Sequence, residues 1–241
     1  MKKILTLLIL SFGLIGCSNI QLEAVSTSAE ETQRILALGL THEENLIEAS
    51  KIKSDHKASV VKLQLINAND EKIQAEIDLI ESTKYANSVL VSENNLNFSG
   101  PELVTTVKKG VLATDIDIQT IQLKGNKDSN GEIEHTLVVK IEHISLNKRT
   151  YNSANLCDAW GRCDGERFEL NLISSNSKNC TSSACNHSDV MEFNFSDEFL
   201  RGKINESGFT DGLTMKINRS RFSNKVNVPS AYLTGYLMIA Q

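Results

Sequence analysis

The sequence is poor in several residues that mark large classes of protein. It contains only two prolines and one tryptophan, and aromatic residues make up 5% of its 241 positions. Acidic residues outnumber basic ones by 30 to 25, which gives a net charge of −5. Affinity for nucleic acid comes largely from Lys and Arg on phosphates, so no nucleic acid partner is expected.

Motifs of catalysis are also absent from the sequence. It has no Gly-x-Ser-x-Gly elbow, no His-Glu-x-x-His helix, no phosphate-binding loop and no Cys-x-x-Cys pair. A Ser/His/Asp set that meets only in space stays open, because its members need not be neighbours in sequence. We therefore expect a protein that acts by binding, without a cofactor, and an enzyme is the less favoured alternative.

The first residues have the pattern of an export signal. Lys2 and Lys3 precede an apolar run from Ile4 to Ile15, which is shorter than the roughly 20 residues of a membrane-spanning helix. A basic start, a short apolar segment and a small residue before the cleavage site predict a secretory signal peptide over residues 1–16. Without the two lysines, the net charge of the mature chain is −7.

The end of this leader, Leu14-Ile15-Gly16-Cys17, resembles the lipobox of bacterial lipoproteins. The resemblance implies cleavage before Cys17, a diacylglycerol on its thiol, and a further acyl chain such as palmitate on the new amino group. Two or more acyl chains make a stable membrane anchor, at ~0.8 kcal/mol per buried methylene. An ordinary cleaved signal, with a cysteine nearby by chance, is the alternative.

The residues after Cys17 bear on location. In lipoproteins, an Asp directly after the cysteine tends to retain the protein at the inner membrane, and here Ser18 and Asn19 follow. The resemblance therefore implies an outer-membrane lipoprotein that faces the periplasm or the cell surface. Residues 17–27 are small and polar, and they are expected to tether the lipid to the fold.

Residues 28–241 are expected to form a single β-rich domain with a helical start. Two residues with a hydroxyl are followed three positions later by Glu, which is the spacing of a helix capping box. The pairs are Ser28 with Glu31 and Thr41 with Glu44. They predict two short helices that pack on one side or end of a sheet, and a helix that binds a partner is the alternative.

The apolar period shortens from about 3.6 to 2 after Ser59, which favours strands. Residues 61–65 and 73–79 alternate in polarity on either side of a polar segment, residues 67–70. This pattern predicts an antiparallel hairpin with one wet and one buried face.

A second predicted hairpin joins residues 115–124 to 132–146 around Asn130-Gly131, a dipeptide that tolerates two positive φ angles. Gly100-Pro101 is expected to break the chain, and residues 103–113 are ambiguous. Further strands are predicted at 88–92, 167–173 (with Phe168, Leu170 and Leu172 inward), 190–195, 213–218 and 231–240. About nine or ten short strands indicate an antiparallel β-sandwich or barrel. A division near residues 148–156 is the alternative to one domain.

Four cysteines remain once Cys17 carries lipid. They are Cys157, Cys163, Cys180 and Cys185. An even set in an exported protein predicts two disulfides. We favour pairing each cysteine with its near neighbour, which closes two short loops beside strands, and a nested pairing stays open. A zinc site is disfavoured. The two cysteine pairs have five and four residues between their members, whereas structural zinc sites usually have two to four.

Two polar segments resemble metal sites, and neither leads us to predict a metal. Residues 126–134 match the first nine positions of a calcium loop, but Leu137 stands where a bidentate Glu is required. Asp158, Asp164 and Glu166 lie beside the first cysteine pair, and a solvated loop is favoured there over a cation site.

The histidines do not cluster in the sequence. His135 and His143 would share one strand face about 26 Å apart, at ~3.3 Å per residue, and each is expected at a surface or an edge. Asp115 and Asp117 would point to one side of a strand, as an acid–base pair must. With Ile116 between them, they are expected to form the wet face of an amphipathic strand.

One basic run stands out near the C-terminus. Its members are Lys216, Arg219, Arg221 and Lys225. A solvated strand end and loop is favoured, and contact with phosphates or an acidic partner is the alternative.

Two functions are therefore considered. The leading one is a membrane-anchored lipoprotein whose β domain offers an edge or loops to an envelope or assembly protein, for example by β-augmentation. The alternative is a ligand-binding or hydrolytic β domain with a site near the loops of Cys157 to Cys185. It predicts a cleft in which Asp158, Asp164, Glu166 and His187 converge.

Overall fold

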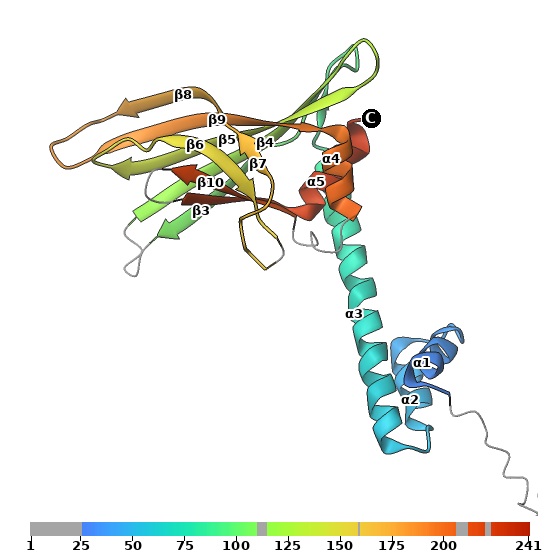
Figure 1. The fold of residues 1–241 in the computed structure, drawn as a ribbon. Helices are drawn as coiled ribbons and strands as arrows, with labels where there is room; N and C mark the ends of the chain where they lie inside the picture. Colours follow the sequence, from blue (N-terminus) through green and yellow to red (C-terminus); the bar gives the residue numbers. More distant parts are fainter. Residues whose placement is uncertain (1–25, 110–114, 159, 206–211, 220–222) are drawn as a thin grey trace, which may run out of the picture. The chain divides into compact units, whose positions relative to one another are not determined.

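The computed structural model describes residues 26–109, 115–158, 160–205, 212–219 and 223–241 (Figure 1). The predicted signal peptide, the lipidation site Cys17 and most of the predicted tether lie outside the described residues. The chain divides into two compact units, one up to Lys72 and one from Ile73, and the boundary falls within helix α3 (Asp55–Ala86). No described helix has the length and hydropathy that a membrane span requires.

The first unit is helical and contains α1 (Ser28–Leu36), α2 (His42–Ser50) and the start of α3. The capping box of α2, Thr41 with Glu44, is confirmed. The box of α1 is formed by Thr27 and Glu30, one residue earlier than predicted. The predicted partner Glu31 instead forms an ion pair with Arg34 at 2.6 Å.

The predicted hairpin over residues 61–79 is wrong, because this segment lies within the 32-residue helix α3. Val61 and Leu65 are one helical turn apart, and both pack into a small core with Ile35 and Ala49. That spacing satisfies a period of 3.6 as well as a period of 2. The Lys, Gln, Glu and Ala residues of the segment 61–79 are all good helix formers.

The second unit is mainly β and contains two antiparallel sheets, which confirms the predicted class and the sandwich-like arrangement. The first sheet has the order β1 (Leu90–Val91), β2 (Asn97–Ser99), β4 (Asp115–Lys127), β5 (Ile133–Ser145), β9 (Cys185–Ser196) and β8 (Asn171–Lys178), with β3 (Leu103–Lys109) also on β4. The second sheet has the order β11 (Ser223–Val228), β10 (Leu213–Arg219), β6 (Tyr151–Leu156) and β7 (Arg167–Glu169).

The predicted chain break and the second predicted hairpin are both present, but in the Asn130-Gly131 turn only the glycine has a positive φ angle. Strands β2 and β3 pair with the same β4 on either side of Gly100-Pro101, which confirms the break there. The hairpin of β4 and β5 is confirmed, with Gly131 at φ +88°. The Asp128 carboxylate accepts hydrogen bonds from the backbone N–H groups of Asn130 and Glu132, both at 2.8 Å. The Asp128 side chain thus closes the turn of the calcium-like segment by binding the segment's own backbone.

The core of the second unit lies between the two sheets. Along β5, alternate residues point inward, and Leu137, Val139 and Ile141 are fully buried. They share one core with Met215 and Ile217 of the second sheet.

The predicted strand 167–173 is split between the sheets, since β7 pairs with β6 and β8 pairs with β9. Phe168 packs edge-on against Phe195, and Leu170 packs partly buried against the core, as predicted. Leu172 is 48% exposed, so its predicted inward orientation is wrong.

The predicted strand 231–240 is also wrong, because Ser230–Ile239 forms helix α5. A Cβ on Gly235 would lie 2.2 Å from the backbone oxygen of Ser82 in α3, so the two helices approach closely at this glycine. Tyr232 OH accepts a hydrogen bond from the Leu123 N–H and donates one to the Pro101 carbonyl, both at 2.9 Å. Helix α5 and α4 (Asp197–Asn205) lie at one end of the sheets (Figure 1).

Candidate functional site

Both predicted disulfides are present, Cys157–Cys163 and Cys180–Cys185. The first closes a short loop between β6 and β7, and the second closes the turn between β8 and β9. Cys157 is 2% exposed, and its N–H donates to the Thr214 carbonyl of β10 at 2.9 Å. The loop that follows Cys157 is therefore fixed at its base to the second sheet.

Asp158 holds the loop together from inside. Its Oδ1 accepts hydrogen bonds from the N–H groups of Trp160 (3.0 Å) and Arg162 (2.8 Å), and its Oδ2 accepts from Arg162 Nε at 2.9 Å. Desolvation raises the pKa of Asp158, but the bonds from Arg162 and Trp160 outweigh it and hold the pKa below its ordinary value. The carboxylate therefore stays charged and keeps organising the loop at mildly acidic pH.

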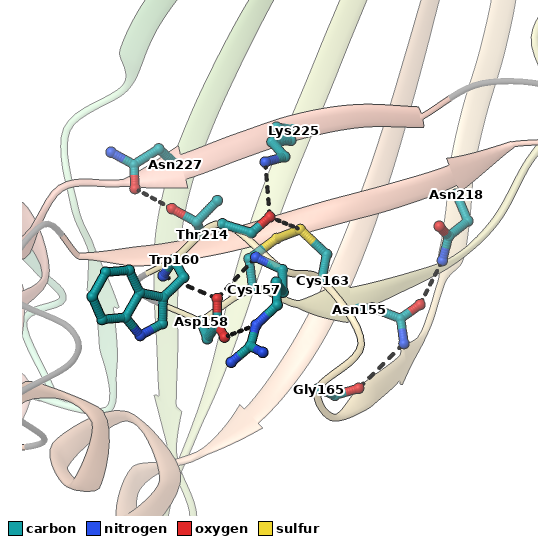
Figure 2. Close-up of a disulfide and its surroundings, with 12 residues drawn as sticks. Asn155, Cys157, Asp158, Trp160, Cys163, Gly165, Thr214, Asn218, Lys225 and Asn227 are labelled. Carbon is teal, nitrogen blue, oxygen red and sulfur yellow. Dashed lines mark hydrogen bonds and ion pairs between the residues drawn. A yellow bond between two sulfur atoms is a disulfide. The ribbon is translucent and has the colours of Figure 1, made fainter.

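Gly161 links the loop to β11. Its φ of +75° is a left-handed conformation that side chains with a Cβ rarely adopt. Its carbonyl accepts a hydrogen bond from Lys225 Nζ at 3.1 Å. The loop is thus fixed by a disulfide, by an internal carboxylate and by a contact to a neighbouring strand (Figure 2).

This fixed backbone presents Trp160, the single tryptophan of the chain, to solvent (Figure 2). The side chain is 85% exposed, and the neighbouring Arg162 side chain is 72% exposed. Trp and Arg are enriched among the residues that dominate protein interfaces. A loop that is already ordered loses little entropy on binding. We call residues 157, 158 and 160–163 the Trp160 loop and regard it as the candidate site.

The outer face of the second sheet adjoins this loop and is polar. Thr214 Oγ1 donates to Asn227 Oδ1 at 3.0 Å, and Asn218 Nδ2 donates to Asn155 Oδ1 at 2.7 Å (Figure 2). The amide and hydroxyl groups of this face are therefore mostly engaged with one another.

The structure divides the basic run. Lys216 and Lys225 are directly opposite each other across β10 and β11. Arg219 is part-buried near Arg149. Burial is the main reason that its pKa is lowered, and the positive charge of Arg149 lowers it further. Arg221 lies outside the described residues.

The residues of the predicted cleft do not share one environment. Asp158 is bonded within its own loop, and Asp164 and Glu166 are exposed. His187 is buried on β9 in the first sheet, where its ring nitrogens contact Ser177 Oγ (2.9 Å) and the Ser145 carbonyl (3.0 Å).

Sequence reasoning missed a buried polar cluster between the sheets. His143 and His187 are paired across β5 and β9, and their rings stack with centroids 4.8 Å apart. Asp189 Oδ2 lies 3.5 Å from His143 Nε2. The expectation of surface or edge positions for His135 and His143 is therefore wrong, since both are at most 3% exposed. The cross-strand register that joins His143 to His187 is non-local and leaves no signal in the sequence.

This cluster brings together Ser145, His143 and Asp189, but not in a reactive arrangement. Ser145 Oγ lies 3.1 Å from His143 Nδ1, and it donates its single proton to the Asn147 carbonyl at 2.7 Å. The serine must therefore accept a hydrogen bond from Nδ1–H, and the histidine does not act as its base.

Asp117 belongs to the same buried region, so its predicted position on a wet face is wrong. It is 0% exposed, and its Oδ2 accepts hydrogen bonds from Arg149 Nη1 (2.6 Å) and Asn224 Nδ2 (2.7 Å). Ile116 faces outward and is 46% exposed. Every second residue of β4 from 117 to 123 is buried, so these four residues lie on one face of the strand. Ile121 and Leu123 are apolar members of this series, and they could have indicated from the sequence that Asp117 faces inward. The side chain of Asp115 lies outside the described residues.

A cleft of about 240 Å³ opens between β3 and β11. Its walls include Leu103, Val107, Ile121 and Val226. Gln119 also lines it, is 4% exposed, and its Nε2 has no hydrogen-bond partner within the described part of the chain. A buried donor of this kind is costly unless an acceptor occupies the space beside it.

The residues that the structure describes contain no group of three His, Cys, Asp or Glu side chains placed to hold a metal ion. The four described cysteines are bonded to one another in pairs. No protein-family model, curated protein or solved structure matches this chain.

Proposed function

We propose that the protein is a lipid-anchored binding protein of the bacterial outer membrane, whose Trp160 loop contacts another protein of the envelope. The lipobox resemblance at Leu14 to Cys17 supports the anchor. Two disulfides support a fold that matures outside the reducing cytoplasm. The acyl chains hold the β domain at the membrane, and the loop supplies the specific contact.

One observation carries the binding role: the chain's only tryptophan is 85% exposed on a loop fixed by a disulfide and by Asp158. Large aromatic side chains are normally covered, and an exposed one on a rigid backbone gains most by inserting into a partner's pocket. The loop's hydrogen bonds to β10 and β11 hold it in place on the second sheet.

Site-specific photo-crosslinking in the native envelope tests this role. A photoreactive residue in place of the exposed Asp164, beside the loop, should give a discrete crosslinked species, and one in place of Lys178 on β8 should not. In the protein that carries this photoreactive residue, Trp160→Ala should weaken binding of the crosslinked partner roughly 30-fold, the equivalent of about 2 kcal/mol. The control Leu172→Ala, at another exposed apolar residue, should leave capture unchanged. Equal capture by the Trp160 variant and the wild type would remove the loop from the proposal.

The anchor is tested separately by the intact mass of the purified protein. An acylated product that begins at Cys17 is expected, and Cys17→Ala should release the protein from the membrane fraction. An unmodified cysteine on a freely diffusing protein would contradict the anchor without affecting the loop.

A second candidate function, small-ligand binding, is favoured by the cleft at Gln119 rather than by the loops of Cys157 to Cys185. An apolar ligand with one acceptor, such as hexanoate, would satisfy Gln119 Nε2. Val107→Trp should fill the cleft and abolish any rise in thermal stability that hexanoate causes. A rise that persists in this variant would contradict binding at the cleft.

A further inference from the structure

The part of helix α3 within the second unit carries an apolar stripe that no described residue covers. Every residue from Ile73 to Glu81 is exposed. Ile73, Ile77 and Ile80 are 48%, 42% and 70% exposed. Their spacings of four and three residues place them on one face of the helix. We call these three isoleucines the α3 stripe.

The stripe has the spacing of a coiled-coil seam. Ile77 occupies an a position, and Ile73 and Ile80 occupy d positions, in the heptad notation abcdefg. Glu76 then takes the g position and Glu81 the e position, on either side of the seam. A helix that is solvated on all sides is marginal in water, and a matching helix would cover the apolar face.

The charges on the stripe's flanks select the kind of partner. Between Ile73 and Glu81 the helix carries Glu76, Asp78 and Glu81, and no Lys or Arg. In a parallel pair of identical helices, Glu76 would face Glu81 of the second copy, because g positions meet e positions of the next heptad. In an antiparallel pair centred here, Glu76 would face its own equivalent. Like charges oppose both arrangements, and they also oppose docking on an anionic membrane surface.

We propose that the α3 stripe docks an amphipathic helix of another protein, in which apolar a and d residues are flanked by Lys or Arg. The isoleucines would be buried between the helices, and Glu76 and Glu81 would pair with the partner's cations. This inference does not depend on the Trp160 loop, which lies on a different element of the second unit.

The test uses the full-length protein and two synthetic helical peptides with Ile at a and Leu at d. One peptide has Lys at every e and g position, and the other has Glu. Fluorescence anisotropy should show binding of the Lys peptide, weaker at high salt, and at least about tenfold weaker binding of the Glu peptide. Equal affinity for both peptides would overturn the charge argument.

Two variants with the same change in charge separate docking from general attraction between an acidic protein and a basic peptide. Ile77→Asp lies in the stripe, and Leu79→Asp lies beside it at a c position, where Leu79 is 58% exposed. We expect Ile77→Asp to abolish binding and Leu79→Asp to preserve it, with unchanged circular dichroism in both. Binding that both variants retain would overturn the proposal. Self-association of the wild type that Ile77→Asp removes would also overturn it, in favour of a second copy.

Discussion

Helix α5 buries most of its apolar residues, whereas the exposed part of α3 leaves its apolar residues in solvent. Six of the ten residues of α5 are buried, and its two tyrosines reach hydrogen-bond partners across the core. From Ile73 to Glu81, α3 has no buried residue. Apolar surface that is buried within the chain stabilises the fold, whereas surface left in solvent is available to a partner. Substitutions should therefore lower stability in α5 and leave it unchanged in the exposed part of α3.

Among substitutions that introduce no charge, the largest effect is expected at Gly235. A Cβ there would lie 2.2 Å from Ser82 O and 2.9 Å from Ala86 N, both backbone atoms that cannot move aside cheaply. Gly235→Ala should lower the free energy of unfolding by about 3 kcal/mol, because α5 must shift away from α3. Denaturant unfolding of the purified protein measures this loss.

The control for Gly235 is Gly202→Ala in α4, where a Cβ would meet no atom within 4 Å. Gly costs up to about 1 kcal/mol relative to Ala inside a helix, so this variant should be more stable than the wild type. A similar response at both glycines would contradict the close approach of the two helices.

The next largest effect is expected at Tyr232. Tyr232→Phe removes the acceptor for the buried Leu123 N–H and the donor to the Pro101 carbonyl. An unsatisfied buried N–H costs about 1–3 kcal/mol, so the unfolding free energy should fall by about 2 kcal/mol. Tyr85→Phe is the control, because its ring keeps the edge contact with Tyr232 at 5.3 Å. An unchanged stability of Tyr232→Phe would show that water replaces the hydroxyl.

Both helices expose the limit of period-based prediction. Val61 and Leu65 fit either a strand or a helix, and only their packing against Ile35 and Ala49, which are distant in sequence, decides for the helix. In α5 almost every residue is apolar, so the sequence has no period to detect. Where the alternation was unambiguous and the turn was Asn130-Gly131, the predicted hairpin of β4 and β5 is confirmed.

The candidate site was predictable in part. The spacing of Cys157 and Cys163 favoured their disulfide, which is present, but it left a nested pairing open. The only tryptophan of the sequence lies between these two cysteines, a coincidence that sequence reasoning did not use. The buried cluster was not predictable, because His143 meets His187 only through the pairing of β5 with β9.

A smaller, pH-dependent effect is expected at His135, which contacts Tyr236 OH of α5 and Asp197 Oδ1, both at 3.0 Å. Burial lowers the pKa of His135 below its ordinary value of 6.5, although Asp197 opposes this. The unfolded chain therefore takes up a proton at a higher pH than the folded one. Stability should be lost as the pH falls below about 6.5, and the loss should level off below the folded pKa.

His135→Gln should remove this part of the pH dependence, measured as the change in unfolding free energy between pH 7.5 and pH 5.5. His56→Gln is the matched control, since His56 is exposed on α3. An equal loss on acidification in His135→Gln and the wild type would assign the effect to other groups. Asp197 is one of them. Desolvation raises its pKa, but the hydrogen bonds from Arg201 and His135 outweigh this and hold the pKa below its ordinary value, so its contribution is lost only at more acidic pH.

The smallest effect on stability is expected at Ile77, which is 42% exposed in α3. Ile77→Asp removes no buried contact, so the unfolding free energy should change by less than about 0.5 kcal/mol. Leu233 in α5 is 2% exposed, and Leu233→Asp would bury a carboxylate without a partner, at a cost of several kcal/mol. The same kind of substitution should therefore lower the unfolding free energy strongly in α5 and hardly at all in the exposed part of α3. If Ile77→Asp were as destabilising as Leu233→Asp, the α3 stripe would be covered within the protein itself, and its isoleucines would serve the fold and not a partner.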